Sequence, residues 1–290
     1  MSVANLPAPR KTKKLPFVQG QLALPLAIFL ALFYAIPMIM LLAASFQPDS
    51  GSGLTLAQYQ AFFTDSTNLK VLTITFSLGL QVTLACLVFG YPVAYFYHHA
   101  TAQWKSILTF LILLPLLTSA VVRTFGWVVI LGRQGLINSA LVGLGILDEP
   151  VKLLFTHLGV AMAMTQIWLP LMVLSIISSL AQIDSRLAAA SESLGGGKWR
   201  TFWQITLPLS LPGIISGCLL VFALTVSSFV TPSIIGGGQL MYMPTLIYQQ
   251  GVVLLNKPFA ATVSAVLLIM VLMVVFFLST LSQRTRKYIR

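Results

Sequence analysis

Six long, mostly apolar runs dominate this chain and limit its fold more than any other feature. They cover residues 22–46, 71–97, 106–131, 153–183, 205–235 and 259–281. A helix needs about 20 such residues to cross the hydrocarbon core of a bilayer, where no water can satisfy its backbone. With only 8% charged residues, the chain also lacks the polar surface of a soluble domain. The sequence therefore predicts an all-α integral membrane protein with about six transmembrane helices.

Basic residues gather at the chain ends and in alternate loops between these runs. With six spans, one side of the membrane receives Arg10, Lys11, Lys13, Lys14, Lys105, Arg186, Lys198, Arg200, Arg284, Arg286, Lys287 and Arg290, and the other receives Lys70, Arg133, Lys152 and Lys257. Because Lys and Arg concentrate in cytoplasmic loops, this bias of about three to one predicts that both termini are cytoplasmic. A charge distribution of this kind, without basic stripes, argues against nucleic acid as a partner.

We divide the chain into a basic cytoplasmic tail (1–20), a transmembrane domain (21–282) and a second basic cytoplasmic tail (283–290). The first apolar run is too long for a signal peptide and has no clear small-residue cleavage site, so we expect it to remain as a span. Arg123 is the one basic residue inside an apolar run. It is either a functional intramembrane charge or a residue that reaches the headgroups from an interfacial helix over 124–131, with the third span ending near Val122.

The polar residues of the spans do not predict an enzyme or a metal site. Cys86 and Cys218 lie inside apolar runs, where cysteine behaves as a small hydrophobe, and no CxxC or Cys/His cluster accompanies them. His157 is the only histidine within a span, and the motifs Gly-x-Ser-x-Gly and His-Glu-x-x-His do not occur. We therefore expect no catalytic residues, no bound metal and no directly bound cofactor.

The polar interruption over 184–208 differs from the other loops. Asp184 or Ser185 can cap a helix that continues to Leu194, and Gly195 suits a left-handed turn at its end. A second short helix begins near Lys198. The small side chains over 188–191 would allow a partner to pack closely against the first helix. The pattern predicts a helix, a glycine turn and a helix on the cytoplasmic side.

The spacing in this loop resembles the EAA loop of binding-protein-dependent ABC importer permeases. That family has Glu-Ala-Ala, three residues, Gly, nine residues, Ile, one residue and Leu-Pro, and this chain has Gly195, Ile205, Leu207 and Pro208 at matching positions. Ala189, Ala190 and Ser191 stand where the family has Glu-Ala-Ala, so the acidic residue is absent. Glu192, nearly one helical turn away, is the candidate substitute.

The resemblance implies a type I ABC importer transmembrane fold in a bacterial inner membrane. Its implied partners are a dimer of cytoplasmic ABC ATPases, a second permease, identical or homologous, an extracytoplasmic solute-binding protein and membrane lipid. The implied coupling residues are Ala188, Ala189, Ala190, Ser191, Glu192, Gly195, Ile205, Leu207 and Pro208. ATP would be used by the partner, because the only P-loop-like pair here, Gly197-Lys198, is followed by Trp199 and preceded by Glu192 at the first glycine position.

Within this family, residues 122–138 and 228–237 look most similar to spermidine/putrescine permeases, which implies a polyamine or a related cationic or amino-acid-like solute. A polyamine needs carboxylates or aromatic faces around its ammonium groups, and no Asp or Glu lies inside a span. The candidate pathway residues are therefore the aromatics Trp127, Trp168, Phe229 and Tyr248. The alternative for each is a packing or interfacial role.

Three other classes of membrane protein compete with this interpretation. A secondary transporter places coupling ionisable groups near the bilayer midplane, and only Arg123 qualifies. An intramembrane enzyme lacks its catalytic motifs here. A channel or scaffold fits the spans equally well but gives no reason for the loop over 184–208.

Overall fold

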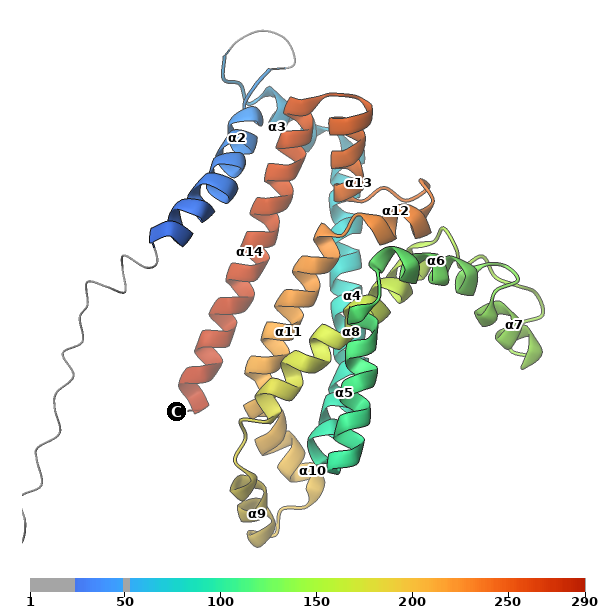
Figure 1. The fold of residues 1–290 in the computed structure, drawn as a ribbon, viewed down its shortest axis with the longest axis vertical. Coiled ribbons are helices and arrows are strands. Elements are labelled where there is room, and N and C mark those ends of the chain that lie inside the picture. The colour runs from blue at the N-terminus through green and yellow to red at the C-terminus, as the bar shows by residue number, and fades with distance from the viewer. Residues whose placement is uncertain (1–23, 49–52, 290) are drawn as a thin grey trace, which may run out of the picture.

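Long helices that run side by side form the body of the structure, a computed structural model (Figure 1). It describes residues 24–48 and 53–289, and of residues 185, 188, 189, 192 and 281–289 it describes the backbone only. Six helices in this part of the chain are long and apolar enough to cross a membrane: Leu24–Ala44, Ser66–His99, Ala120–Gly143, His157–Leu180, Lys198–Ser227 and Lys257–Thr280. The described residues contain no strand, which confirms the predicted all-α membrane fold.

The elements follow the apolar runs closely. The first span contains η1 (Ala31–Ala35) and α2 (Ile36–Ala44), and the later elements are α3 (Ala57–Thr64), α4 (Ser66–His99), α5 (Ala102–Leu117), α6 (Ala120–Leu131), α7 (Leu136–Gly143), α8 (His157–Leu180), α9 (Ser185–Ser193), α10 (Lys198–Thr201), η2 (Phe202–Thr206), α11 (Leu207–Ser227), α12 (Val230–Gly236), α13 (Met243–Tyr248), η3 (Gln249–Val253) and α14 (Lys257–Ile289). The three η elements are π-helical turns.

The core forms where α4, α8 and α11 pack against one another. Its fully buried side chains include Val82, Met164, Met172 and Val221. Helices α8 and α11 approach closely because Gly213 faces Ser175 and Ser179, and a Cβ there would lie 2.7 Å from the Ser175 carbonyl oxygen. Such close contacts between small residues supply van der Waals packing, which drives helix association in lipid. A second cluster joins α3, α4, α11, α13 and α14.

The third apolar run is not one continuous helix, so the expected span over 106–131 is wrong in detail. Helix α5 ends at Leu117, and Thr118 and Ser119 are extended, with ψ of 148° and 133°. Pro115 is one cause, because proline cannot donate a helical hydrogen bond. The Thr118 hydroxyl also donates to the Pro115 carbonyl oxygen at 2.9 Å and stabilises the helix end. Helix α6 then turns away from the direction of α5 (Figure 1).

Residues 118–156 form an outer arm, which contains α6 and α7 and extends from the body of the molecule (Figure 1). Although 120–143 is apolar enough to span, it consists of two helices that lie across the other helices, whereas the shorter α5 runs alongside α4. The bundle of helices that run alongside one another therefore contains α5 together with the first span, α4, α8, α11 and α14. The fifth run also ends earlier than expected, at Ser227, because Ser228 is extended and α12 begins after it.

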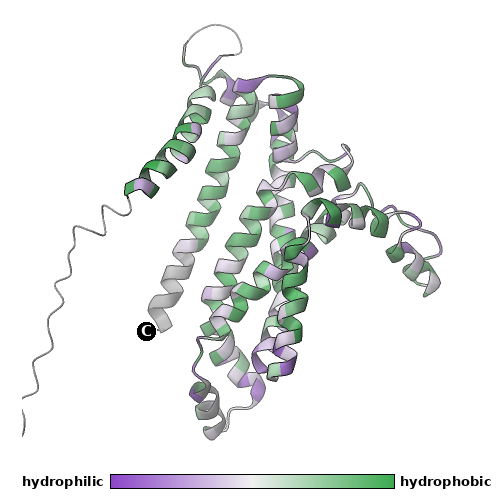
Figure 2. Cartoon of the chain, viewed as in Figure 1, coloured by the Kyte–Doolittle hydropathy of each residue, from purple (hydrophilic) through white to green (hydrophobic). Residues whose placement is uncertain are grey.

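The two ends of the bundle carry different groups of loops. The α4–α5 turn, α9, α10 and the end of α14 lie at one end, whereas α3, α12 and α13 lie toward the other (Figure 1). Figure 2 shows apolar residues along the helices and hydrophilic residues gathered near these ends. Lys105, Lys198 and Arg200 thus share an end, as the charge bias required. We refer to this as the inner end, and a cytoplasmic location for it remains a prediction.

Candidate functional site

The inner loop over 184–208 has the predicted helix, glycine turn and helix. The Asp184 carboxylate accepts a hydrogen bond from the Arg186 backbone N–H at 2.9 Å, so Asp184 begins α9 as one of the two expected caps. Gly195 ends the helix with φ of +79°, a left-handed conformation that favours glycine. A substituent at Gly195 would meet nothing within 4 Å, so this position needs glycine for its backbone conformation and not for space.

The next residue, Gly196, must be glycine because there is no space for a side chain. A Cβ at Gly196 would lie 2.6 Å from Ser191 Oγ and 2.9 Å from the Ser191 carbonyl oxygen. The Gly196 N–H donates to that carbonyl at 2.8 Å. The Ser191 hydroxyl also pairs with the Thr201 hydroxyl at 2.8 Å, which joins α9 to α10. Sequence reasoning missed Gly196, although the run of three glycines was a signal for a tight turn.

An aromatic cluster connects α10 to α4. The Phe202 ring packs edge-on against Tyr91 and Tyr95, with ring centroids 5.8 and 5.3 Å apart. Phe202 also contacts Trp199 and Trp203 edge-on. The Tyr91 hydroxyl lies 3.2 Å from Ser210 Oγ on α11. A movement of α10 would therefore be carried through Phe202 of η2 to α4 and α11 together. No pattern in the sequence indicated these contacts between distant segments.

The loop exposes more apolar surface than a solvent-facing turn needs. Leu194 is 87% exposed and Trp199 is 75% exposed, and Leu187 and Trp203 are also exposed. Ala190 is exposed on α9. Large exposed apolar patches on a protein surface mark interaction sites. The side chains of Ala188, Ala189 and Glu192 lie outside those that the structure describes, so the proposed substitution of Glu192 for the missing acid stays a prediction.

The matching residues at the end of the loop lie on a continuous helical path. Ile205 lies in the π-helical turn η2, and Leu207 and Pro208 are the first residues of α11. Pro208 lies just after the π-helical turn, so the continuous helix here includes a residue that donates no backbone hydrogen bond. No break separates α10, η2 and α11 in the structure, so the inner loop connects directly to a spanning helix.

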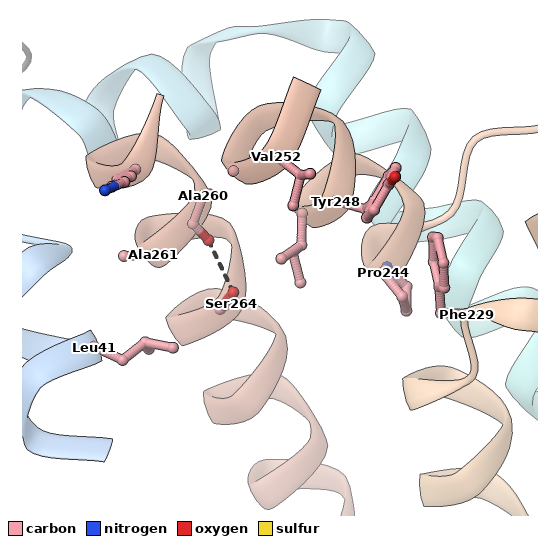
Figure 3. Close-up of a pocket in the computed structure, with 11 residues that line it drawn as sticks. Leu41, Phe229, Pro244, Tyr248, Val252, Ala260, Ala261 and Ser264 are labelled. Carbon is pink, nitrogen blue, oxygen red and sulfur yellow. Dashed lines mark hydrogen bonds between the residues drawn. The ribbon is translucent and has the colours of Figure 1, made fainter. Parts of the chain in front are cut away.

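Two of the four aromatic candidates for the solute pathway lie together. Phe229 and Tyr248 line a groove of about 480 Å³ between the first span, α13, η3 and α14, and their rings face each other with centroids 5.0 Å apart (Figure 3). Leu41, Val252 and Ala261 make most of the remaining wall apolar (Figure 3). Lys257 also lines the groove. A lysine charge there opposes a cationic ligand, so the groove is a poor site for an ammonium group.

The other two candidates lie apart from this groove. The Trp127 indole N–H donates to Gln166 Oε1 on α8 at 3.1 Å and packs against the core. Trp168 also packs against the core from α8, and its buried Nε1 has no hydrogen-bond partner among the described residues. The structure therefore does not bring the four aromatics into one site. Packing accounts for Trp127.

Arg123 lies near the start of α6 in the outer arm, outside the spanning bundle. Its Nε and Nη1 atoms are buried and have no hydrogen-bond partner in the described part of the chain. Helix α6 begins at Ala120 and includes Arg123, so the helix break lies before Val122, where the interfacial interpretation ended the third span. Among the described residues, no group of three His, Cys, Asp or Glu could hold a metal ion.

Sequence comparisons identify the relatives of this chain. Residues 139–287 match the model of the family described as binding-protein-dependent transport system inner membrane component. The chain is 31% identical over 253 residues to the spermidine/putrescine transport system permease protein PotB of Haemophilus influenzae, covering 86% of this chain and 88% of the relative. It is 33% identical over 246 residues to PotB of Escherichia coli K12, covering 83% and 89%.

A solved structure agrees in fold. A chain of a bacterial alginate ABC transporter, crystallised with an alginate pentasaccharide-bound periplasmic protein, superposes with a TM-score of 0.75 at 20% identity over 92% of this chain and 94% of that one. The fold and the inner loop thus define a membrane subunit of ABC importer type. This chain belongs to the family of binding-protein-dependent transport system inner membrane components, and it is a multi-pass protein of the inner membrane.

Proposed function

We propose that this chain is the permease subunit of an ATP-driven importer of polyamines such as spermidine or putrescine. The observation that carries the proposal is the inner loop, a pair of short helices with exposed apolar side chains at the end of a membrane bundle. Relatives that cover more than four fifths of this chain are permeases of spermidine/putrescine systems, which favours a polyamine as the solute. The proposed partners are two ABC ATPase subunits, a second permease and a solute-binding protein.

The inner loop is the proposed contact through which the ATPases drive transport. ATP would bind only to the partner subunits, whose closure would push α9 and α10. Because Ser191 pairs with Thr201, and Phe202 packs on Tyr91 and Tyr95, the loop would move as one body with α4 and α11. These two helices belong to the packed core, so their movement would alternate access to the pathway between the two membrane sides.

Uptake of labelled spermidine by the complete complex in proteoliposomes tests the proposal. We expect uptake that requires ATP inside the vesicles and persists when a proton uncoupler is added. Ala190→Asp places a charge on the exposed side of α9, and Gly195→Val imposes strain at a positive φ. Both changes should abolish ATP-driven uptake. If both variants transport normally, the loop is not the coupling site, and uptake that collapses with the uncoupler but survives ATP depletion would indicate a secondary transporter.

A further inference from the structure

An exposed glutamine lies at the centre of the longest span. Gln81 is the sixteenth residue of the 34-residue helix α4, about 22 Å along the axis from Ser66 and about 27 Å from His99 at 1.5 Å per residue. These distances place it within the hydrocarbon depth of the bilayer. Its side chain is exposed, while the buried faces of α4 pack against α8 and α11.

A primary amide at this depth needs more partners than the chain supplies. Gln81 Nε2 donates to Ser77 Oγ at 3.0 Å, and no other side-chain hydrogen bond of Gln81 occurs in the part of the chain that the structure describes. Its Oε1 therefore remains a free acceptor. Unsatisfied polar groups are strongly disfavoured in lipid tails, so this face of α4 requires water or a polar partner.

Gln81 ends a polar stripe that begins near the outer end of α4. Thr73, Ser77 and Gln81 are spaced four residues apart and share one face of the helix. Below Gln81 this exposed side becomes apolar, with Leu84 51% and Val88 65% exposed. The polar half thus extends from the outer end to mid-membrane and stops there.

The exposed faces of other spans are different. On α5 the exposed side chains include Ile107, Phe110 and Leu114, and on α14 they include Ile269, Leu272 and Phe276. These faces suit lipid. Ser216 is exposed on α11, but its hydroxyl donates to the Gly213 carbonyl at 3.0 Å and is satisfied within its own helix. Gln81 cannot be satisfied in this way.

We infer that the face of α4 with Thr73, Ser77 and Gln81 lines the water-filled solute pathway, and that Gln81 Oε1 accepts a hydrogen bond from an ammonium group of the passing solute. The inference rests on the proposed polyamine transport and names a contact within it. A neutral acceptor holds an amine without the strong ion pair that a carboxylate would form, so it can also release the amine. Lys70, about 16 Å further out along the axis, lies beyond the screening length of about 8 Å at physiological salt.

Cysteine accessibility tests this inference in the complete complex. The variants Thr73→Cys, Gln81→Cys and Val88→Cys are made with Cys86→Ala and Cys218→Ala, because both native thiols lie within spans. A membrane-impermeant, cationic methanethiosulfonate is added from the outer side. We expect it to modify Thr73→Cys and Gln81→Cys but not Val88→Cys. Spermidine should slow the modification of Gln81→Cys at least about fivefold.

Two results would overturn the inference. Modification of Thr73→Cys without Gln81→Cys would show that Gln81 packs in a dry helix contact, for example with the second permease. Modification of Gln81→Cys that spermidine does not slow would exclude the amine contact. Labelling reports water access without any transport, so a negative result here is distinct from failure of the proposed function, which appears as absent ATP-dependent uptake by the unmodified complex.

Uptake kinetics provide a second measurement. Gln81→Leu should raise the KM for spermidine about fivefold with little change in ATPase activity, whereas Gln81→Glu retains the acceptor and should not raise the KM. A purely structural role would lower the amount of assembled complex in both variants and leave the KM unchanged, and that result would also contradict the inference.

Discussion

The inner loop over 184–208 and the outer arm over 118–156 both interrupt the apolar spans, yet they are stabilised in different ways. The inner loop depends on backbone geometry at Gly195 and Gly196 and on one hydroxyl pair. Within the outer arm, the buried Asn138 side chain joins separate segments: it donates to the carbonyls of Gly132 and Val151 and accepts from the Val151 N–H, each at 3.0 Å. A turn that depends on backbone conformation can be recognised in the sequence by its glycines. A bridge made by one asparagine side chain has no such sequence pattern.

The largest effect is expected when a side chain is added at Gly196. Gly196→Val would place Cβ against the Ser191 carbonyl oxygen, which cannot rotate away, and we expect a cost of about 3 kcal/mol, the upper part of the usual range for overpacking. ATP-driven uptake should fall more than about 100-fold, because each 1.4 kcal/mol corresponds to about a factor of ten. The ATPase activity of the assembled complex should remain.

Gly197→Val is the matched control for this prediction. Gly197 lies in the same loop with φ of −68°, and a Cβ there meets nothing within 4 Å. Uptake by this variant should stay within about twofold of the unchanged protein, since surface substitutions without clashes change stability by about 0.5 kcal/mol or less. Equal losses in both variants would show that the loop tolerates no side chain at all, and that the Ser191 contact is not the cause.

The second effect concerns the arm. Asn138→Ala removes three hydrogen bonds and leaves buried backbone groups without partners, so the arm should lose about 2 kcal/mol of local stability. The Val151 amide should then exchange its hydrogen about 30-fold faster, as measured by hydrogen exchange with mass spectrometry over the arm. Asn138→Asp keeps the acceptor for the Val151 N–H and should give an intermediate rate. An unchanged rate in Asn138→Ala would mean that Phe155, whose N–H donates to Ile235 O, is the main anchor.

The third prediction tests whether Phe202 transmits movement from the inner loop to α4. Phe202→Ala removes the ring contacts with Tyr91 and Tyr95, which are worth about 0.5–1.5 kcal/mol for each aromatic pair. Uptake per ATP hydrolysed should fall about fivefold, because α10 would move without α4. Phe96→Ala, which removes a ring contact with Trp104 away from the inner loop, is the control and should retain the ratio. A parallel fall in uptake and ATPase activity in Phe202→Ala would point to lost assembly and contradict a coupling role.

The apolar runs and the glycine spacing were sufficient to predict the spans and the inner loop, because both depend on interactions local in sequence. Other features depend on contacts between distant segments. The break at Thr118 and Ser119 lies inside an apolar run and carries only Pro115 as a local signal. Phe202 could not be distinguished from Trp199 or Trp203 until its packing on α4 was known. Gln81 was visible in the sequence, but its exposure in mid-span depends on which face of α4 the other helices cover.

The smallest effect is expected in the groove beside α14. Phe229 and Tyr248 are not part of a tight turn or a hydrogen-bonded bridge like those of the inner loop and the arm. The charge of Lys257 opposes a cation in the groove. Phe229→Ala and Tyr248→Ala should therefore change the KM for spermidine by less than about twofold, which is below the roughly two- to fivefold change that a cation–π contact of about 0.5–1 kcal/mol would give. Gln81→Leu, measured in the same vesicles, is the comparison. A rise in KM of fivefold or more in either groove variant, with no rise in Gln81→Leu, would move the solute pathway from the polar face of α4 to the groove.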